Sequence, residues 1–134
     1  MSFQPVTFCL PIADRPTSHA FYRAVLGLDA VGEPTEDGVP EPLRFALNEG
    51  ALLMLIPSGG FAWVTGERPQ APRGSSECVL SLPAATEDEV DALVARAVAA
   101  GGVLVAAPEK QPWGYTGSFT DPDGHMWLVE AAAE

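Results

Sequence analysis

Cysteine, histidine and basic residues are all scarce in this chain of 134 residues. It has two cysteines, two histidines and seven lysines and arginines, against 18 aspartates and glutamates, which leaves a formal net charge of −11. Such an excess of negative charge repels phosphate groups, so the composition argues against nucleic acids or anionic membranes as partners. Cys9 and Cys78 lie in apolar, strand-like runs where free thiols are common. We therefore expect a reduced, cytoplasmic protein, with a disulfide as the open alternative.

Long hydrophobic runs and an N-terminal leader pattern are also missing. No apolar stretch approaches the roughly 20 residues that a membrane-spanning helix needs. The N-terminal segment MSFQPVTFCLPIADRP has no basic residue before its apolar part, and prolines interrupt it early, so we expect no signal peptide. Because 47% of the residues are hydrophobic, the chain can bury a core, and its length fits one domain.

Two segments have the pattern of amphipathic helices. Either Asp14 or Thr17 is the expected N-cap of the first, and a glycine supplies its stop. The second begins with a capping box, Thr86–Glu89, which places three acids in the first turn, and it ends at Gly101–Gly102. The apolar faces consist of Phe21, Val25 and Leu28 in the first helix and of Val90, Leu93, Val94, Ala97 and Val98 in the second.

Short strands are predicted around these helices, separated by connections rich in proline and glycine. The longest and least regular connection runs from Pro57 to Ser76 and contains Phe61 and Trp63. The predicted strands are Val6–Ile12, Leu43–Leu47, Ala51–Ile56, Glu77–Leu82, Val103–Ala106, Gly117–Thr120 and His125–Glu130.

The two halves of the chain repeat one pattern about 70 residues apart. Each half contains, in the same order, Leu-Pro, a helix with the sequence Arg-Ala-Val, a glycine, a strand and a proline. Arg23–Val25 in the first half corresponds to Arg96–Val98 in the second. One duplication of this length is two copies of a module rather than a solenoid. We expect a first module at about 3–57, a linking loop at 58–75 and a second module at about 76–131. A sheet in such a module buries one face under its helix and leaves the other for a partner or a ligand.

Several short motifs occur in a fixed order along the chain: Asp14, Phe21-Tyr22, Leu26-Gly27-Leu28, Gly117-Ser118-Phe119, the turn Asp121–His125 and Trp127. In this order and spacing they resemble a known family, the vicinal-oxygen-chelate superfamily of glyoxalase I, bleomycin-resistance proteins and extradiol dioxygenases. Met-Leu before a loop with phenylalanine, and a glutamate at the fifth strand, are most similar to its uncharacterised predicted lactoylglutathione lyase branch. The resemblance implies an α+β fold with two tandem βαβββ modules that form a curved mixed sheet around a cleft.

The same resemblance indicates where a metal would bind. Metal-using members draw ligands, usually His and Glu, from one inward position on the first, fourth, fifth and last strands. Here those positions hold Thr7, Met54, either Glu77 or Val79, and Leu128. A divalent metal needs three or four suitable donors. At most one is present, so we expect no catalytic metal and no cofactor.

The remaining candidates predict a ligand site rather than a metal site. Glu77 is the candidate general base. Arg44 is the only basic residue in these strands, and alternation puts it on the side opposite Phe45. The site is therefore expected to lack positive charge, which favours a planar neutral or cationic ligand over a glutathione conjugate. The expected ligand-binding residues are Thr7, Cys9, Met54, Phe61, Trp63, Trp113, Tyr115, Leu128 and Glu130.

Three functions are consistent with these residues. We favour a metal-free small-molecule binding protein of the bleomycin-resistance type, with the ligand held in the cleft between modules. The alternative is a lyase, isomerase or dioxygenase-like enzyme that uses Glu77 as a base or a non-standard metal site. A third possibility is a fold kept for interaction or regulation, with its cavity filled by side chains. A homodimer is expected in each case, because one apolar sheet face per module needs covering.

Overall fold

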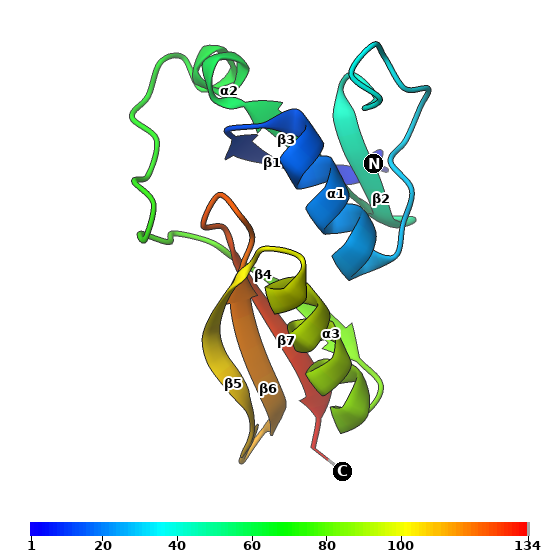
Figure 1. The fold of residues 1–134 in the computed structure, drawn as a ribbon, viewed down its shortest axis with the longest axis vertical. Coiled ribbons are helices and arrows are strands. Elements are labelled where there is room, and N and C mark those ends of the chain that lie inside the picture. The colour runs from blue at the N-terminus through cyan, green and yellow to red at the C-terminus, as the bar shows by residue number, and fades with distance from the viewer. Residues whose placement is uncertain (134) are drawn as a thin grey trace. The chain divides into compact units, whose positions relative to one another are not determined.

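Alternating apolar residues form the strands, and the two amphipathic helices lie between them in the predicted order. The computed structural model describes residues 1–133, and the chain divides into two units, Met1–Gln70 (unit 1) and Ala71 onward (unit 2). Figure 1 shows the elements in chain order. They are β1 (Val6–Ile12), α1 (Arg15–Leu26), β2 (Leu43–Asn48), β3 (Ala51–Pro57), α2 (Ser58–Val64), β4 (Val79–Ala84), α3 (Glu87–Ala99), β5 (Val103–Gln111), β6 (Gly114–Thr120) and β7 (Met126–Ala132).

Unit 1 is a three-stranded sheet with α1 packed on one face. The strand order is β1-β3-β2, with β1 parallel and β2 antiparallel to the central β3. Asp14 is the N-cap of α1, because its carboxylate accepts the backbone N–H of Thr17 at 3.0 Å. Gly27 ends the helix at φ 69°, a left-handed conformation that favours glycine. The apolar core under α1 includes Ile12, Phe21, Tyr22, Val25, Leu43, Phe45, Leu53 and Leu55.

Unit 2 is a four-stranded sheet covered on one face by α3. Its order is β4-β7-β6-β5, with β4 parallel to β7 and the other neighbours antiparallel. The predicted capping box forms: Thr86 accepts the N–H of Glu89 at 3.1 Å, and the Glu89 carboxylate accepts the N–H of Ala85 at 2.7 Å. The core beneath α3 consists of Val90, Val94, Ala97, Phe119, Trp127, Val129 and Ala131.

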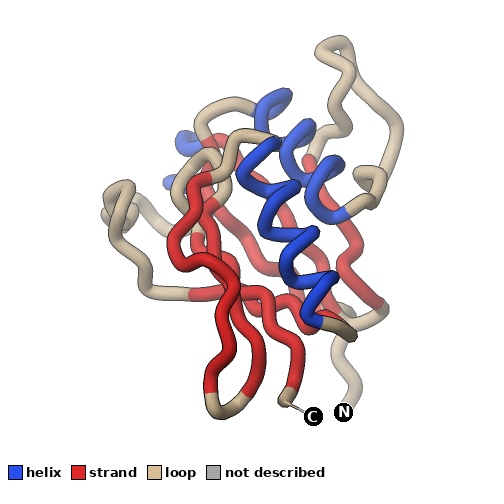
Figure 2. The backbone as a smooth tube through the Cα atoms, turned by 60° about the horizontal axis from the view of Figure 1, so that its bottom comes forward, coloured by secondary structure: helices blue, strands red, loops and turns tan. Residues whose placement is uncertain are grey.

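Several predicted boundaries differ from the observed ones. The connection after Pro57 contains a short helix, α2, and not only irregular chain. The rest of that connection, residues 65–78, contains no helix or strand, and neither do residues 27–42 (Figure 2). β4 begins at Val79, two residues after the predicted start. β5 and β6 are longer than predicted because their turn lies at Pro112-Trp113. Proline and glycine weakened the strand pattern there, but hairpin pairing between β5 and β6 outweighs that preference.

The chain is therefore an α+β protein of two βαβββ modules, as predicted. Unit 2 has all four strands. In unit 1 the segment between α1 and β2 contributes only an isolated bridge, Pro34 with Pro40, because proline has no N–H to donate to a ladder. Within residues 1–133, no helix is both long enough and apolar enough to cross a membrane.

Candidate functional site

The sheet face of unit 1 that points away from α1 is the first candidate surface. Leu53 and Leu55 are 0% and 1% exposed, so alternation along β3 turns their neighbours to the opposite face. Strand register extends this face across the sheet. We call it the open face of unit 1; it consists of Thr7, Cys9 and Pro11 of β1, Leu52, Met54 and Ile56 of β3, and Arg44 and Ala46 of β2.

One row of the open face of unit 1 combines a thiol, a thioether and a guanidinium group. Met54 pairs with Cys9 on one side and with Arg44 on the other. Cys9 is exposed, whereas Arg44 and Met54 are half-buried. The Arg44 Nε atom is buried and has no hydrogen-bond partner among the described residues. This row therefore places an unpaired positive charge beside apolar side chains.

The position of Arg44 corrects one expectation from the sequence. Arg44 does lie opposite Phe45, but Phe45 is the residue beneath α1, with its ring 6.0 Å from that of Tyr22. Arg44 therefore belongs to the open face, and the expectation of a site without positive charge is wrong. The signal was present in the sequence, because Arg44 lies between two apolar residues, Leu43 and Phe45, that alternation assigns to the core.

The corresponding face of unit 2 is the second candidate surface. Trp127 and Val129 are buried at 1% and 0% exposure on the α3 side, so the residues between and beside them point away from that helix. We call this surface the open face of unit 2. It consists of Met126, Leu128 and Glu130 of β7, Val79, Ser81 and Pro83 of β4, Thr116, Ser118 and Thr120 of β6, and Val103, Ala106 and Glu109 of β5.

The indicated metal-ligand positions all lie on these two open faces. Thr7 and Met54 lie on the face of unit 1, and Val79 and Leu128 lie on that of unit 2. A hydroxyl, a thioether and two aliphatic side chains do not match the imidazole, carboxylate or thiolate donors that divalent transition metals require. Among residues 1–133, no three His, Cys, Asp or Glu side chains are grouped to hold a metal ion. The residues present do not fit a metal.

Glu77 does not lie where the sequence placed it. It precedes β4 and is exposed, so it is a loop residue and not the first residue of a strand. The sequence left Glu77 and Val79 as alternatives for one position on the open face of unit 2. Val79 occupies that position. A general base needs a partner that orients it. Within the described chain, no hydrogen bond or ion pair holds the Glu77 carboxylate.

Tyr115 lies on the covered side of the sheet, against α3. Its hydroxyl donates a 2.7 Å hydrogen bond to the Asp91 carboxylate of that helix. This hydrogen bond, with a smaller contribution from burial, raises the pKa of Tyr115 to about 12. The expectation that Tyr115 is a loop aromatic is wrong, because pairing of β5 with β6 draws it into a strand whose alternation points it at α3.

The other predicted site residues occupy three different settings. Phe61 and Trp63 lie on α2, where Phe61 is half-buried and Trp63 is 79% exposed. Trp113 is 63% exposed in the β5–β6 turn. Glu130 lies on the open face of unit 2, and its Oε1 atom would be 3.3 Å from a Cβ atom added at Gly114. Neither Trp63 nor Trp113 belongs to an open face as defined above.

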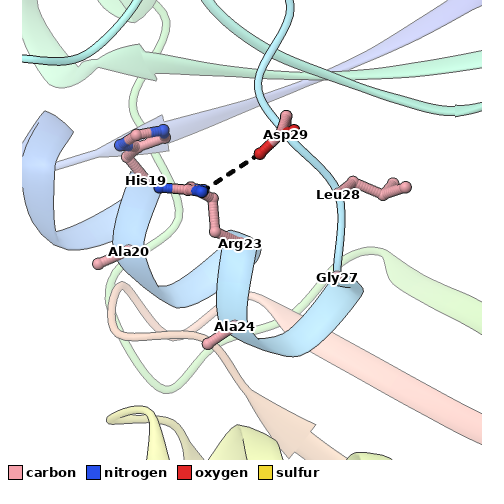
Figure 3. Close-up of a pocket in the computed structure, with 7 residues that line it drawn as sticks. All are labelled: His19, Ala20, Arg23, Ala24, Gly27, Leu28 and Asp29. Atoms are coloured by element: carbon pink, nitrogen blue, oxygen red, sulfur yellow. Dashed lines mark hydrogen bonds and ion pairs between the residues drawn. The ribbon is translucent and has the colours of Figure 1, made fainter.

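A shallow hollow of about 480 Å³ lies beside the C-terminal half of α1 (Figure 3). The Arg23 side chain crosses it and forms an ion pair with Asp29 at 3.2 Å. Burial lowers the pKa of His19, and the guanidinium groups of Arg23 and Arg15 lower it further. The two charged residues of the hollow, Arg23 and Asp29, are therefore paired with each other. Its lining consists of His19, Ala20, Arg23, Ala24, Gly27, Leu28 and Asp29.

A second hollow, of about 510 Å³, lies between α3 and β5 in unit 2. It is almost entirely apolar and continues into the first residues of β5. That strand is an edge of the sheet, and its Val103, Leu104 and Val105 are 60%, 47% and 52% exposed. Exposed apolar side chains on an edge strand are typical of an association surface rather than of a small-molecule site. The lining residues are Asp91, Val94, Ala95, Val98, Ala99, Leu104 and Pro108.

Comparisons with known proteins agree with the fold. The family model described as the Glyoxalase/Bleomycin resistance protein/Dioxygenase superfamily matches residues 4–129. Hypothetical protein SA1046 from S. aureus is 25% identical, with a TM-score of 0.80, over 98% of this chain and 96% of that one. A glyoxalase-related enzyme from Fulvimarina pelagi is 29% identical, with a TM-score of 0.81, over 96% and 87%.

A third solved structure with a similar fold is that of a binding protein. TnmS3, an antibiotic binding protein from Streptomyces sp. CB03234, is 26% identical to this chain, with a TM-score of 0.65. The similarity covers 99% of this chain and 98% of TnmS3. No curated protein matches the chain.

Proposed function

The chain belongs to the Glyoxalase/Bleomycin resistance protein/Dioxygenase superfamily, and from this premise we propose that it binds a small planar molecule without a catalytic metal. One observation carries the proposal: the open faces bear Thr7, Met54, Val79 and Leu128 at the four positions that would have to supply metal ligands. These side chains suit contact with an apolar ligand surface better than coordination of a cation.

The similar structures include both a binding protein and an enzyme, so the choice between the two functions rests on the residues of the open faces. Similarity to an antibiotic binding protein, TnmS3, supports binding, whereas similarity to a glyoxalase-related enzyme supports catalysis. The enzymatic alternative requires an oriented base, and Glu77 is an exposed loop residue without a described partner. On the open face of unit 2, Glu109 and Glu130 both pair with Thr116. Within the described residues, no hydrogen bond or ion pair orients either carboxylate as a base. Binding is therefore the better-supported function.

The proposal predicts saturable, metal-independent binding of planar aromatic compounds. We expect 2-naphthoate or 2-naphthamide to bind with a dissociation constant in the micromolar range, with or without EDTA, as measured by calorimetry. Met54→Asp should weaken binding by about tenfold or more, because it places a charge against the ligand without disturbing the core. Val64→Asp, at a 56% exposed valine of α2, is the matched control and should bind normally.

Two results would contradict this function. One is the absence of saturable binding of both naphthalene probes up to millimolar concentrations. The other is turnover of the methylglyoxal–glutathione adduct on addition of Zn²⁺, Ni²⁺ or Mn²⁺, which would favour the enzymatic alternative. A Met54→Asp variant that bound like the parent would instead move the site away from the open face of unit 1.

We also propose that the protein forms a homodimer, and β5 offers a surface for it. Val98 of α3 is 44% exposed beside the exposed valines and leucine at the start of β5. Val105→Lys should shift the protein toward monomer in sedimentation velocity, because a lysine on an edge strand opposes association. Val64→Lys, which changes an equally exposed valine elsewhere, should leave the distribution unchanged. A parent protein that sediments as a monomer at high micromolar concentration would contradict the dimer.

A further inference from the structure

We propose that Arg44 makes the open face of unit 1 selective for ligands that carry one carboxylate group. This inference rests on the proposed binding function and specifies the charge of the ligand that the same face would bind. It reverses the preference for neutral or cationic ligands that the sequence suggested. Arg44 is the specificity-determining residue, and the apolar side chains of Met54 and Leu52 beside it would contact the uncharged part of the ligand.

Arg44 differs from every other basic residue of the chain in lacking both an acceptor and free access to water. Arg15 is also largely buried, and its Nη1 atom likewise lacks a hydrogen bond of good geometry. Its charge is nevertheless paired, because Nε lies 3.3 Å from Asp37 and Nη1 lies 3.0 Å from Glu41. The remaining basic residues are exposed, and most have partners. Arg23 pairs with Asp29, Lys110 pairs with Glu87, and Arg73 donates to the Pro122 carbonyl at 2.6 Å.

The unpaired state of Arg44 is notable because acids outnumber basic residues so strongly in this chain. With 18 aspartates and glutamates against seven lysines and arginines, a carboxylate partner was available in the composition. None lies on the open face of unit 1, whose other residues are Thr7, Cys9, Pro11, Ala46, Leu52, Met54 and Ile56. The guanidinium group of Arg44 therefore has no protein acceptor among the described residues, and an anion that contacts it would supply one.

The geometry favours a monocarboxylate over a more highly charged anion. A guanidinium group binds a carboxylate through two parallel N–H···O bonds, which matches the planar fork of arginine. The face supplies one positive charge only, so a dianion would keep an unpaired charge beside apolar side chains. The net charge of −11 adds long-range repulsion that grows with the charge of the ligand.

The first experiment compares three probes that share one ring system and differ in charge. Calorimetry should show that 2-naphthoate binds about tenfold more tightly than 2-naphthamide, with 2-naphthyl phosphate weaker than the carboxylate. Arg44→Gln should abolish the advantage of the carboxylate. Arg44→Lys should retain only part of it, because lysine keeps the charge but cannot form the bidentate pair. Near-ultraviolet circular dichroism of both variants controls for folding.

The second experiment measures the charge of the face without any ligand, through the exposed thiol of Cys9. Cys9 and Arg44 lie one strand on either side of Met54, about 10 Å apart at their Cα atoms. The protein for this experiment carries Cys78→Ser, so that Cys9 is the only thiol. Iodoacetate and iodoacetamide react with the same Cys9 thiolate, so the thiolate fraction cancels in the ratio of their rates. Because only iodoacetate is charged, this ratio reports the local electrostatic potential. At low ionic strength, Arg44→Gln should lower this ratio by about threefold, and Arg44→Lys should not.

The two experiments separate this inference from the function on which it rests. Equal affinity for naphthoate and naphthamide, or tighter binding of the phosphate, would overturn the inference while the binding function stands. An alkylation ratio that does not change in Arg44→Gln would also overturn it. If neither naphthalene probe binds but the ratio falls with Arg44→Gln, the binding function fails and the anion selectivity of the face is supported.

Discussion

Asp121→Ala is expected to lower the free energy of unfolding by about 2 kcal/mol, because it leaves two partly buried backbone N–H groups without an acceptor. The Asp121 side chain is 0% exposed, and its Oδ1 atom accepts the N–H groups of Asp123 at 3.0 Å and His125 at 2.8 Å. These bonds shape the turn between β6 and β7, two strands that carry the open face of unit 2. Urea denaturation followed by tryptophan fluorescence measures the change.

Asp121→Asn is the matched control for this prediction. Asparagine keeps one acceptor oxygen of nearly the same size and position, so we expect a loss of about 1 kcal/mol only. A parent-like unfolding midpoint for Asp121→Ala would show that the backbone bonds of the turn suffice. Those bonds are the ones from Asp121 N to the His125 carbonyl and from Gly124 N to the Asp121 carbonyl, both at 3.0 Å.

Gly114→Ala is expected to destabilise the protein by about 3 kcal/mol, through a clash with backbone that cannot move alone. A Cβ atom at Gly114 would lie 2.5 Å from the Ala131 carbonyl oxygen of β7. Real Cβ atoms essentially never approach other atoms so closely, so β6 and β7 would have to separate at this point. The same denaturation measurement applies, and the Glu130 side chain, whose Oε1 is 3.3 Å from that Cβ position, would be displaced too.

Gly59→Ala provides the control for the general effect of replacing glycine. A Cβ atom at Gly59 would meet nothing within 4 Å, and neither glycine has a left-handed backbone that alanine would strain. Because Gly59 lies in α2, where alanine is favoured over glycine by about 1 kcal/mol, Gly59→Ala should be at least as stable as the parent. Equal stability of both variants would show that the β6–β7 ladder relaxes to admit a methyl group, and that Gly114 is not required by packing.

Local chemistry in the sequence determined the helices and most of the strands. The caps at Asp14 and Thr86 depend on side chains that bond to backbone groups three residues away, and these are readable from spacing alone. The period of two along β1 likewise assigned Thr7 and Cys9 to one face of their strand, and along β7 it assigned Leu128 to one face and Trp127 to the core. The duplicated pattern, together with the family motifs, identified the fold class.

The tertiary structure alone decided which candidates share a surface. Whether Tyr115 faces α3 or the open face depends on the register of β5 with β6, which is determined by contacts between distant residues. Whether Glu77 or Val79 occupies the open face depends on where β4 begins to pair with β7. The apolar neighbours Leu43 and Phe45 already indicated the face of Arg44, and the packing of Phe45 beneath α1 establishes it. Alternation along a strand defines two faces, but packing of the helix decides which of them is left for a ligand.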